Sequence, residues 1–207
     1  MDSDEKYKSN VAFIDLLFNV LIGFVFLFII AFILINPIAK KGDIIVPAEF
    51  LIVLTWPDDL SDDVDLWVGD KHNHIVGFSK KDSSLMFLDR DDLGLTNDVT
   101  IINDEKVVVK VNREVVSIRG KSSNEYKVSV HLYRKNASNK GSIPVTVEVV
   151  KINPYKIVYK QTKILDAHGQ IANFPSFTVT KESNVTDVIE GTESVVPLYS
   201  DAPTIAK

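Results

Sequence analysis

The chain has 207 residues, a formal net charge of −5 and a pI of about 5.4, and it contains no cysteine. Disulfides and thiolate metal sites are therefore excluded, and the missing cysteine is compatible with a periplasmic location without requiring one. The acidic balance and the lack of a long basic run argue against nucleic acid as a partner.

A long apolar run follows the polar N-terminal segment. From Leu16 to Ile35 every residue is Leu, Ile, Val or Phe except Asn19, Gly23 and Ala31. A helix of about 20 such residues covers the roughly 30 Å hydrocarbon core of a bilayer. The run is longer than the ~7–15 residues of a signal-peptide core, and no small-x-small site follows it. We predict an uncleaved transmembrane helix.

One carboxyl group lies inside this helix. Asp15 precedes Asn19 by one turn on the same face, and Gly23 follows on roughly that side. An Asp at the centre of a span costs about 2.5–3.5 kcal/mol, but each Leu, Ile, Phe or Val returns about 0.3–0.6 kcal/mol, so insertion remains favourable. Two interpretations stay open: Asp15 carries a proton, or it lies at headgroup level near the positive end of the helix dipole. Asn19 and Gly23 either face another helix or are simply tolerated.

The opening segment Asn10-Val11-Ala12-Phe13-Ile14-Asp15, with the apolar run that ends at Asn36-Pro37, resembles the ExbD/TolR transport subunits and more loosely the flagellar stator subunit MotB. The resemblance implies that Asp15 binds the translocated ion. A lone carboxylate with few hydroxyl neighbours favours a proton, with sodium as the alternative, and we expect no cofactor. The resemblance also implies two copies of this chain inside a pentamer of a multi-span partner of the ExbB/TolQ/MotA type.

The resemblance further implies a location in the bacterial inner membrane, with the N-terminus in the cytoplasm and the C-terminal head in the periplasm. Charge alone does not fix this orientation. Lys6 and Lys8 precede the span and Lys40 and Lys41 follow it, so the positive-inside rule gives a tie.

The pattern changes to short alternating runs from Glu49 onward. In the clearest of them Tyr126, Val128, Val130 and Leu132 alternate with polar or exposed types, as expected for a strand with one buried face. Turn signals recur at intervals near 8–12 residues, which is typical of an antiparallel β-sandwich. We predict strands near residues 49–56, 63–69, 73–79, 84–88, 98–102, 106–111, 114–119, 125–134, 142–151, 156–165 and 170–180.

The predicted fold class is therefore a single N-terminal transmembrane α-helix followed by an all-β antiparallel sandwich. Residues 37–48 contain two prolines and a glycine and predict an extended linker, which either transmits a pull or rotation or is a spacer. The C-terminal segment has no sustained period, so we expect either a flexible tail or a segment packed on a sheet edge. The predicted parts are 1–9 (cytoplasmic N-terminus), 10–36 (transmembrane helix), 37–48 (linker), 49–182 (sandwich) and 183–207 (tail).

The head resembles bacterial extracytoplasmic β-sandwich modules of the pre-peptidase C-terminal type. The segments that carry this resemblance are Leu54-Thr55-Trp56, Asp63-Val64-Asp65-Leu66-Trp67-Val68, Tyr126-Lys127-Val128-Ser129-Val130-His131 and Pro144-Val145-Thr146-Val147. The resemblance implies a binding or accessory domain with an unknown extracytoplasmic partner. It departs from the short mixed α/β head of ExbD and from the peptidoglycan-binding head of MotB, so it leaves open what the head contacts.

Acidic residues of the head form two groups, the first made of Asp58, Asp59, Asp62, Asp63 and Asp65 and the second of Asp89, Asp91 and Asp92. Such oxygen-rich segments can bind Ca²⁺, with Asp63, Asp65, Asp89 and Asp91 as the weak candidates. Neither group has EF-hand spacing, so we favour solvated loops and predict no metal.

Two further residue pairs are candidate sites. His72 and His74 could share a metal, but with no third ligand we favour a turn role. Trp56 and Trp67 are predicted to be core aromatics rather than a ligand platform.

The sequence contains no G-x-S-x-G, H-E-x-x-H or phosphate-binding glycine loop, so we expect no enzymatic activity. The leading hypothesis is a stator-like subunit of an ion-driven motor that transmits force or torque to its head. One elementary charge crossing 100 mV supplies about 2.3 kcal/mol for such work. The alternative is a membrane-anchored extracytoplasmic β-sandwich that binds a partner without ion transport.

Overall fold

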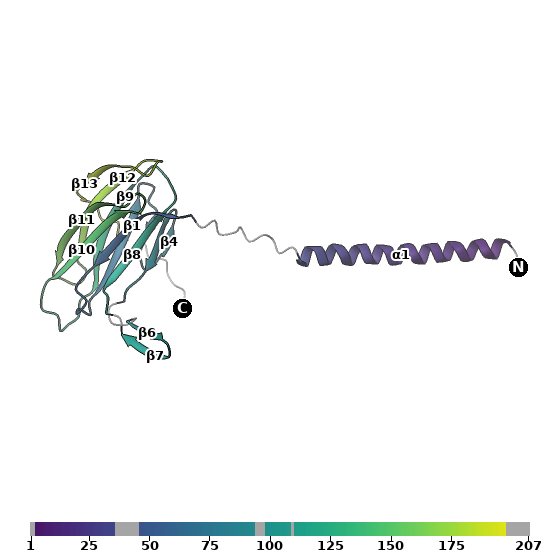
Figure 1. Ribbon diagram of the computed structural model, residues 1–207, viewed down its shortest axis with the longest axis horizontal. Coiled ribbons are helices and arrows are strands. Elements are labelled where there is room, and N and C mark those ends of the chain that lie inside the picture. Colours follow the sequence, from purple (N-terminus) through teal and green to yellow (C-terminus); the bar gives the residue numbers. More distant parts are fainter. Residues whose placement is uncertain (1–2, 36–45, 94–97, 109, 198–207) are drawn as a thin grey trace. The chain divides into compact units, whose positions relative to one another are not determined.

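The computed structural model describes residues 3–35, 46–93, 98–108 and 110–197, with the helical side chains from residue 11 to 32 (Figure 1). The chain divides into two compact units, residues 1–45 and residues 46–207. The first unit contains one described helix and the second contains the β strands. This arrangement confirms the predicted fold class.

The helix α1 spans Ser3–Ile35. Its segment Val11–Phe32 is long and apolar enough to cross a membrane, and none of the tested window is buried within the chain. The helix begins earlier than the predicted residue 10, because the polar segment before it contains no Pro or Gly to stop helix propagation. Most of the predicted linker lies outside the described residues, and its last residue, Ala48, already belongs to the first strand.

The head consists of two antiparallel sheets and one separate hairpin. One sheet has the order β11-β10-β1-β8-β5-β4, the other has the order β13-β12-β9-β2-β3, and β6 pairs with β7 (Figure 1). The strands are β1 (Ala48–Thr55), β2 (Asp63–Asp70), β3 (Ile75–Val76), β4 (Asp82–Ser83), β5 (Met86–Arg90), β6 (Val99–Ile102), β7 (Glu105–Val108), β8 (Arg113–Arg119), β9 (Asn124–Arg134), β10 (Ile143–Lys151), β11 (Lys156–Leu165), β12 (Ile171–Val179) and β13 (Val185–Ile189).

The core lies between the two sheets and follows the alternation of the strands. The residues Tyr126, Val128, Val130 and Leu132 of β9 are all buried, as their spacing predicts. On the facing sheet the inward positions of β1 carry apolar residues as well, among them Phe50. Aromatic rings join the sheets: the Phe177 ring of β12 lies 5.9 Å from Phe50 and 5.4 Å from Tyr126 between ring centroids.

Left-handed residues move the starts of two predicted strands by two residues. Asn73 and Ser84 have φ of 62° and 57°, a conformation that ends a strand in a turn. The predicted run 73–79 therefore gives only the two-residue strand β3, and the run 84–88 is replaced by β5, which begins at Met86 and ends at Arg90, with β4 between them.

The sandwich continues past residue 182, the predicted C-terminal boundary. Strand β13 pairs antiparallel with β12 from Ser176 onward and forms the edge of the five-stranded sheet. Its alternation covers only five residues, which is too short for a period to be recognised in the sequence. Packing on a sheet edge is thus what the structure shows for Val185–Ile189, while residues 198–207 lie outside the described part.

Candidate functional site

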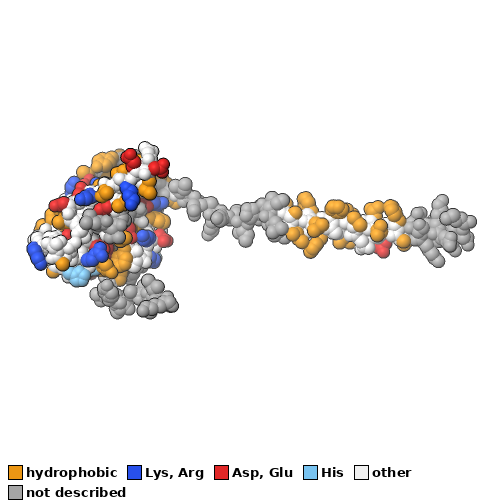
Figure 2. All heavy atoms as spheres, turned by 90° about the horizontal axis from the view of Figure 1, so that it is seen from below, with side chains coloured by type: hydrophobic (Ala, Val, Ile, Leu, Met, Phe, Trp, Pro, Cys, Tyr) orange, Lys and Arg blue, Asp and Glu red, His pale blue; other side chains and the backbone are white. Residues whose placement is uncertain are grey.

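The membrane-type helix presents one ionisable group on an apolar surface. Asp15 is the only acidic or basic residue between Val11 and Phe32. Most other side chains of this segment are hydrophobic and exposed, and hydrophobic atoms cover much of the helix face seen in Figure 2. The helix places Asp15, Asn19 and Gly23 at successive intervals of four residues, and a Cβ at Gly23 would meet no atom within 4 Å. A neighbouring helix could therefore approach this stripe closely.

The head contains a second group of acids, which gathers around the first half of β2. Asp63 and Asp65 lie on the face of β2 that points away from the core, because Val64 and Leu66 point into it. The carboxylates of both are nevertheless buried, with side chains 8% and 5% exposed. Glu114 of β8, together with Asp91 and Asp92 after β5, completes this acidic cluster, and the charges of its members act on one another.

Glu114 replaces a missing strand neighbour of β2. On its outer side β2 pairs with β3 only at Val68 and Gly69. Earlier along β2, where β3 does not reach, the backbone N–H of Leu66 donates a hydrogen bond to Glu114 Oε2 at 2.6 Å. The backbone N–H of Asp92 donates to Glu114 Oε1 at 3.3 Å. Burial raises the pKa of Glu114 well above its usual value, and these two hydrogen bonds oppose the shift only in part.

Asp63 and Asp65 each face a basic side chain of β9. The distance is 3.7 Å from Asp63 Oδ2 to Arg134 Nη2, and 3.5 Å from Asp65 Oδ2 to His131 Nδ1. Burial, and then the neighbouring charge of Asp65, raises the pKa of Asp63 to about 6. Burial also raises the pKa of Asp65, while His131 opposes that shift. Asp63 can therefore exchange a proton near pH 6.

The other two acids of the cluster, Asp91 and Asp92, fix the position of the segment that follows β5. Arg90 donates to Asp92 Oδ2 at 3.0 Å and to the carbonyl oxygen of Val111 at 2.8 Å. Asp91 pairs with Lys81 at 2.9 Å. These contacts attach the segment to Lys81, just before β4, and to Val111, just before β8.

The four predicted calcium candidates do not converge. Asp63, Asp65 and Asp91 belong to the acidic cluster, but Asp89 pairs with Arg119 at 2.5 Å and is not among the charges that act on Asp63. In the part of the chain that the structure describes, no three His, Asp or Glu side chains form a group that could bind a metal ion. Asp62 instead braces a loop, because its carboxylate accepts hydrogen bonds from the Asn136 N–H and the Asn139 side chain, both at 2.7 Å.

The two histidines lie in the turn between β2 and β3. The Asp70 carboxylate accepts the backbone N–H groups of His72 and His74 at 2.8 and 3.0 Å and contacts His74 Nδ1 at 2.9 Å. Burial alone would raise the pKa of Asp70, but its hydrogen bonds from His74 and Asn124 outweigh burial and lower it. A turn role for the histidines accounts for these contacts.

The two tryptophans are buried, as predicted. Trp56 belongs to the core between the sheets, and its indole N–H donates to the carbonyl oxygen of Asp62 at 3.2 Å. Trp67 packs on the outer face of β2 instead, with its ring centroid 5.4 Å from that of Phe78. Both side chains therefore serve packing.

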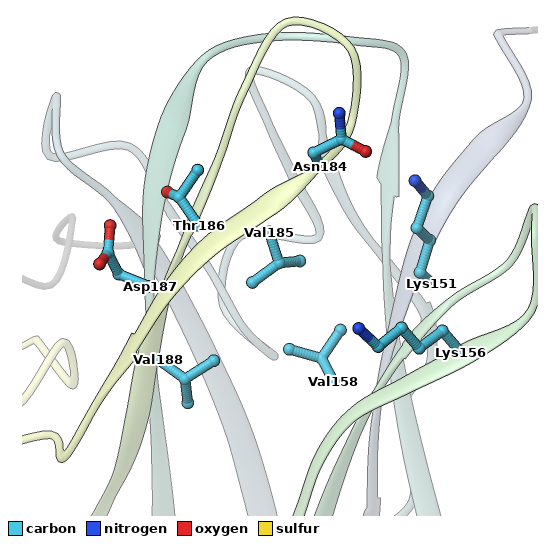
Figure 3. Close-up of a pocket in the computed structure, with 8 residues that line it drawn as sticks. All are labelled: Lys151, Lys156, Val158, Asn184, Val185, Thr186, Asp187 and Val188. Carbon is cyan, nitrogen blue, oxygen red and sulfur yellow. The ribbon is translucent and has the colours of Figure 1, made fainter.

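A groove of about 300 Å³ opens between the ends of β10 and β11 on one side and β13 on the other (Figure 3). Val158 and Val185 face each other at its centre, and the lysine side chains lie on the opposite side from Asp187 (Figure 3). The lining residues are Lys151, Lys156, Val158, Asn184, Val185, Thr186, Asp187 and Val188.

The sequence pattern alone did not single out Glu114 or His131. A signal for Glu114 was present, since it shares the core-facing side of β8 with Val116 and Ile118, where a carboxylate needs a partner. His131 had no such signal, because its position beside Asp65 depends on the register between β2 and β9.

No family model matches the chain, and no solved structure matches it. A trigger factor of Beutenbergia cavernae is similar over part of the sequence, with 29% identity across 93 residues, which are 44% of this chain and 20% of that protein. The chain thus spans about a fifth of the length of this relative, and a match of this extent assigns no family.

Proposed function

We propose that the chain is the single-span subunit of an ion-driven motor in the bacterial inner membrane, similar to ExbD/TolR and MotB. Two copies of its helix work inside a pentameric ring formed by a multi-span partner. Asp15 takes a proton from one side of the membrane and releases it to the other, and the head outside the membrane receives the resulting movement. The protein itself catalyses no chemical reaction in this proposal.

The observation that carries the proposal is Asp15 in the apolar helix. No other charged residue lies between Val11 and Phe32, and a lone carboxyl group in such a segment is costly in a membrane and is retained there mainly for function. Its position in the segment NVAFID agrees with the ion-binding Asp of the family that this segment resembles. Asn19 and Gly23 give the same stripe a hydrogen-bonding side chain and a place for close approach.

The work follows from the two charge states of this carboxyl group. Out of water the neutral acid is favoured, whereas beside a polar or charged group of the ring the carboxylate is favoured. Each change alters the contacts that the helix prefers, so that ring and helix pair shift relative to one another. A proton crossing 100 mV contributes about 2.3 kcal/mol, which is several times RT, and a few protons per step suffice for mechanical work.

The proposal also specifies the orientation of the chain in the membrane and the role of the head. The N-terminus is cytoplasmic and the β-sandwich head is periplasmic, where a head without cysteine forms no disulfides. The head folds as a unit of its own, with its core built from residues after Val46, and so can receive a pull as one body.

The first experiment tests the assembly. Tagged full-length chain is purified from its native membrane in mild detergent, and the mass and stoichiometry of the complex are measured. We expect two copies of this chain with five copies of a multi-span protein. A lone chain, or a complex without a multi-span partner, would favour the anchored binding module instead.

The second experiment tests Asp15 itself. The purified complex is reconstituted in liposomes, and proton uptake is followed with an enclosed pH-sensitive dye. Asp15→Asn should abolish proton uptake while expression, insertion and assembly stay normal, because an amide cannot bind and release the proton. Asp59→Asn is the matched control, since it makes the same change at an exposed position of the head and should leave uptake unchanged. Normal uptake by Asp15→Asn would contradict the proposal.

A further inference from the structure

On one side of the head, the edge strand of one sheet lies beside the edge strand of the other. Within the described residues, β11 pairs with β10 alone and β13 pairs with β12 alone, so each strand has a free outer edge. The groove of Figure 3 joins Lys156 to the start of β13, and Lys163 reaches Glu190, just after β13, at 2.5 Å. The two edge strands therefore run in the same direction on one side of the sandwich.

Apolar side chains are exposed along both of these edges. Ile157 and Ile164 of β11 are 46% and 49% exposed, and Val188 and Ile189 of β13 are 44% and 62% exposed. An open strand edge with exposed apolar residues is a template for pairing with another strand. The surface formed by β11 and β13, called here the open edge, is thus suited to strand addition.

The charged residues of the open edge indicate what kind of partner it binds. Lys151 and Lys156 form no ion pair with any described residue, and the same holds for Asp187. Figure 3 shows the Asp187 carboxylate directed away from both lysines. The β11 side of the open edge is therefore basic and the β13 side is acidic. A surface with positive charge along one strand and negative charge along the other is complementary to a copy of itself that is rotated by a two-fold axis.

We propose that a second copy of this chain covers the open edge, with β11 of each copy beside β13 of the other. The two-fold axis of this contact runs along the strands, so the paired strands are parallel. A two-fold axis perpendicular to the sheets would instead place β11 against β11 and β13 against β13, which brings like charges together. The contact extends each sheet into the opposite sheet of the second copy.

This contact rests on the proposed function, which already places two copies of the chain in one complex, and it adds how their heads are joined. It gives the two heads a shared, continuous β structure, so that a movement delivered to one helix reaches both heads. The contact itself does not involve Asp15, and the two proposals can therefore fail separately.

Cysteine cross-linking tests the contact in the full-length chain. The chain has no native cysteine, so introduced thiols react alone. Two differently tagged forms, one with Ile157→Cys and one with Val188→Cys, are co-expressed and treated in membranes with a short bis-maleimide. We expect a mixed dimer as the main product. Ile101→Cys, at a position of β6 that is 67% exposed, is the matched control and should give little product.

Charge reversal makes the test specific. Lys156→Glu in the first form should lower the yield of mixed dimer about tenfold, because it faces Asp187 of the other copy with a like charge. Adding Asp187→Lys to the second form should restore the yield. Dominant 157–157 and 188–188 products, absence of any product, or a yield that ignores both charge changes would overturn the proposed contact.

A thiol on the helix separates this result from the motor proposal. Gly23→Cys copies should cross-link to each other if the helices are paired. Cross-linking at residue 23 without a 157–188 product would overturn the open-edge contact and leave the motor proposal standing. A 157–188 product without cross-linking at residue 23 would support the contact and count against the helix pair.

Discussion

Burial of carboxyl groups is the dominant feature of the head at the scale of single residues. Glu114 occupies a core-facing position and is kept there by two backbone N–H groups rather than by a cation. Asp63 and Asp65 are buried on the opposite face of β2, where each has one basic neighbour at a distance beyond an ordinary hydrogen bond. In all three residues burial raises the pKa, so the charged forms weaken the fold at neutral pH.

Truncation of Glu114 should show how much its hydrogen bonds contribute. Glu114→Ala leaves the Leu66 N–H buried without an acceptor, and we expect a loss of roughly 2–4 kcal/mol in the free energy of unfolding. Glu114→Gln keeps one acceptor oxygen for the short bond from the Leu66 N–H, loses the longer bond from the Asp92 N–H and removes the charge, so it should cost less than Glu114→Ala. Both tryptophans lie in the head, so urea unfolding followed by tryptophan fluorescence measures this directly. Equal losses in the two variants would show that the hydrogen bonds are unimportant.

The raised pKa of Asp63 predicts how stability depends on pH. The folded state holds the proton up to a pKa of about 6, compared with 3.8 for the free group. The stabilisation by this proton is full below pH 3.8 and is lost as the pH rises through 6. Asp63→Asn should therefore unfold at a higher temperature than the native chain at pH 7.5, and the difference should shrink toward pH 4. A difference that stays constant from pH 4 to pH 7.5 would contradict a raised pKa for Asp63.

Exposure separates the elements of the head into two kinds. Strands β1, β8, β9 and β10 have neighbours on both sides, whereas β6 and β7 pair only with each other among the described strands. Their turn is formed by Asn103 and Asp104, whose φ angles of 52° and 64° are those of a tight hairpin. Apolar residues on both faces of this hairpin are exposed, so packing contributes little to it.

Hydrogen exchange should reveal this difference between elements. A two-stranded hairpin without a packed face is marginally stable in water, so amides of residues 99–108 should exchange far faster than those of β9. Mass spectrometry of the deuterated full-length chain measures both regions at once. Protection of the hairpin equal to that of β9 would mean that a partner covers it.

At the scale of the whole molecule, the chain combines a β-sandwich with its own packed core and a helix whose apolar surface suits a lipid environment. The core residues of the sandwich all lie after Val46, and the helix has an apolar surface suited to lipid. The second unit therefore needs nothing from the first in order to fold.

Separation of the units should leave the head intact. A fragment of residues 46–207 should unfold at the same temperature as the head within the full-length chain, because every core contact is retained. Circular dichroism and tryptophan fluorescence in thermal melts test this. A large drop in the unfolding temperature of the fragment would show that residues 1–45 contribute to the fold.

The sequence by itself determined the helix, the β-sandwich and most of its strands, because hydrophobic period depends only on local order along the chain. It identified Asp15 in the same way, since a lone carboxyl in an apolar run is visible without a fold. Only the tertiary structure decided that the charges of Asp65 and Asp91 act on Asp63, that Glu114 accepts a hydrogen bond from the backbone of β2, that Asp89 pairs with Arg119 instead, and that Val185–Ile189 completes a sheet. These facts depend on which strands become neighbours and in which register, and pairing between distant segments leaves no local pattern in the sequence.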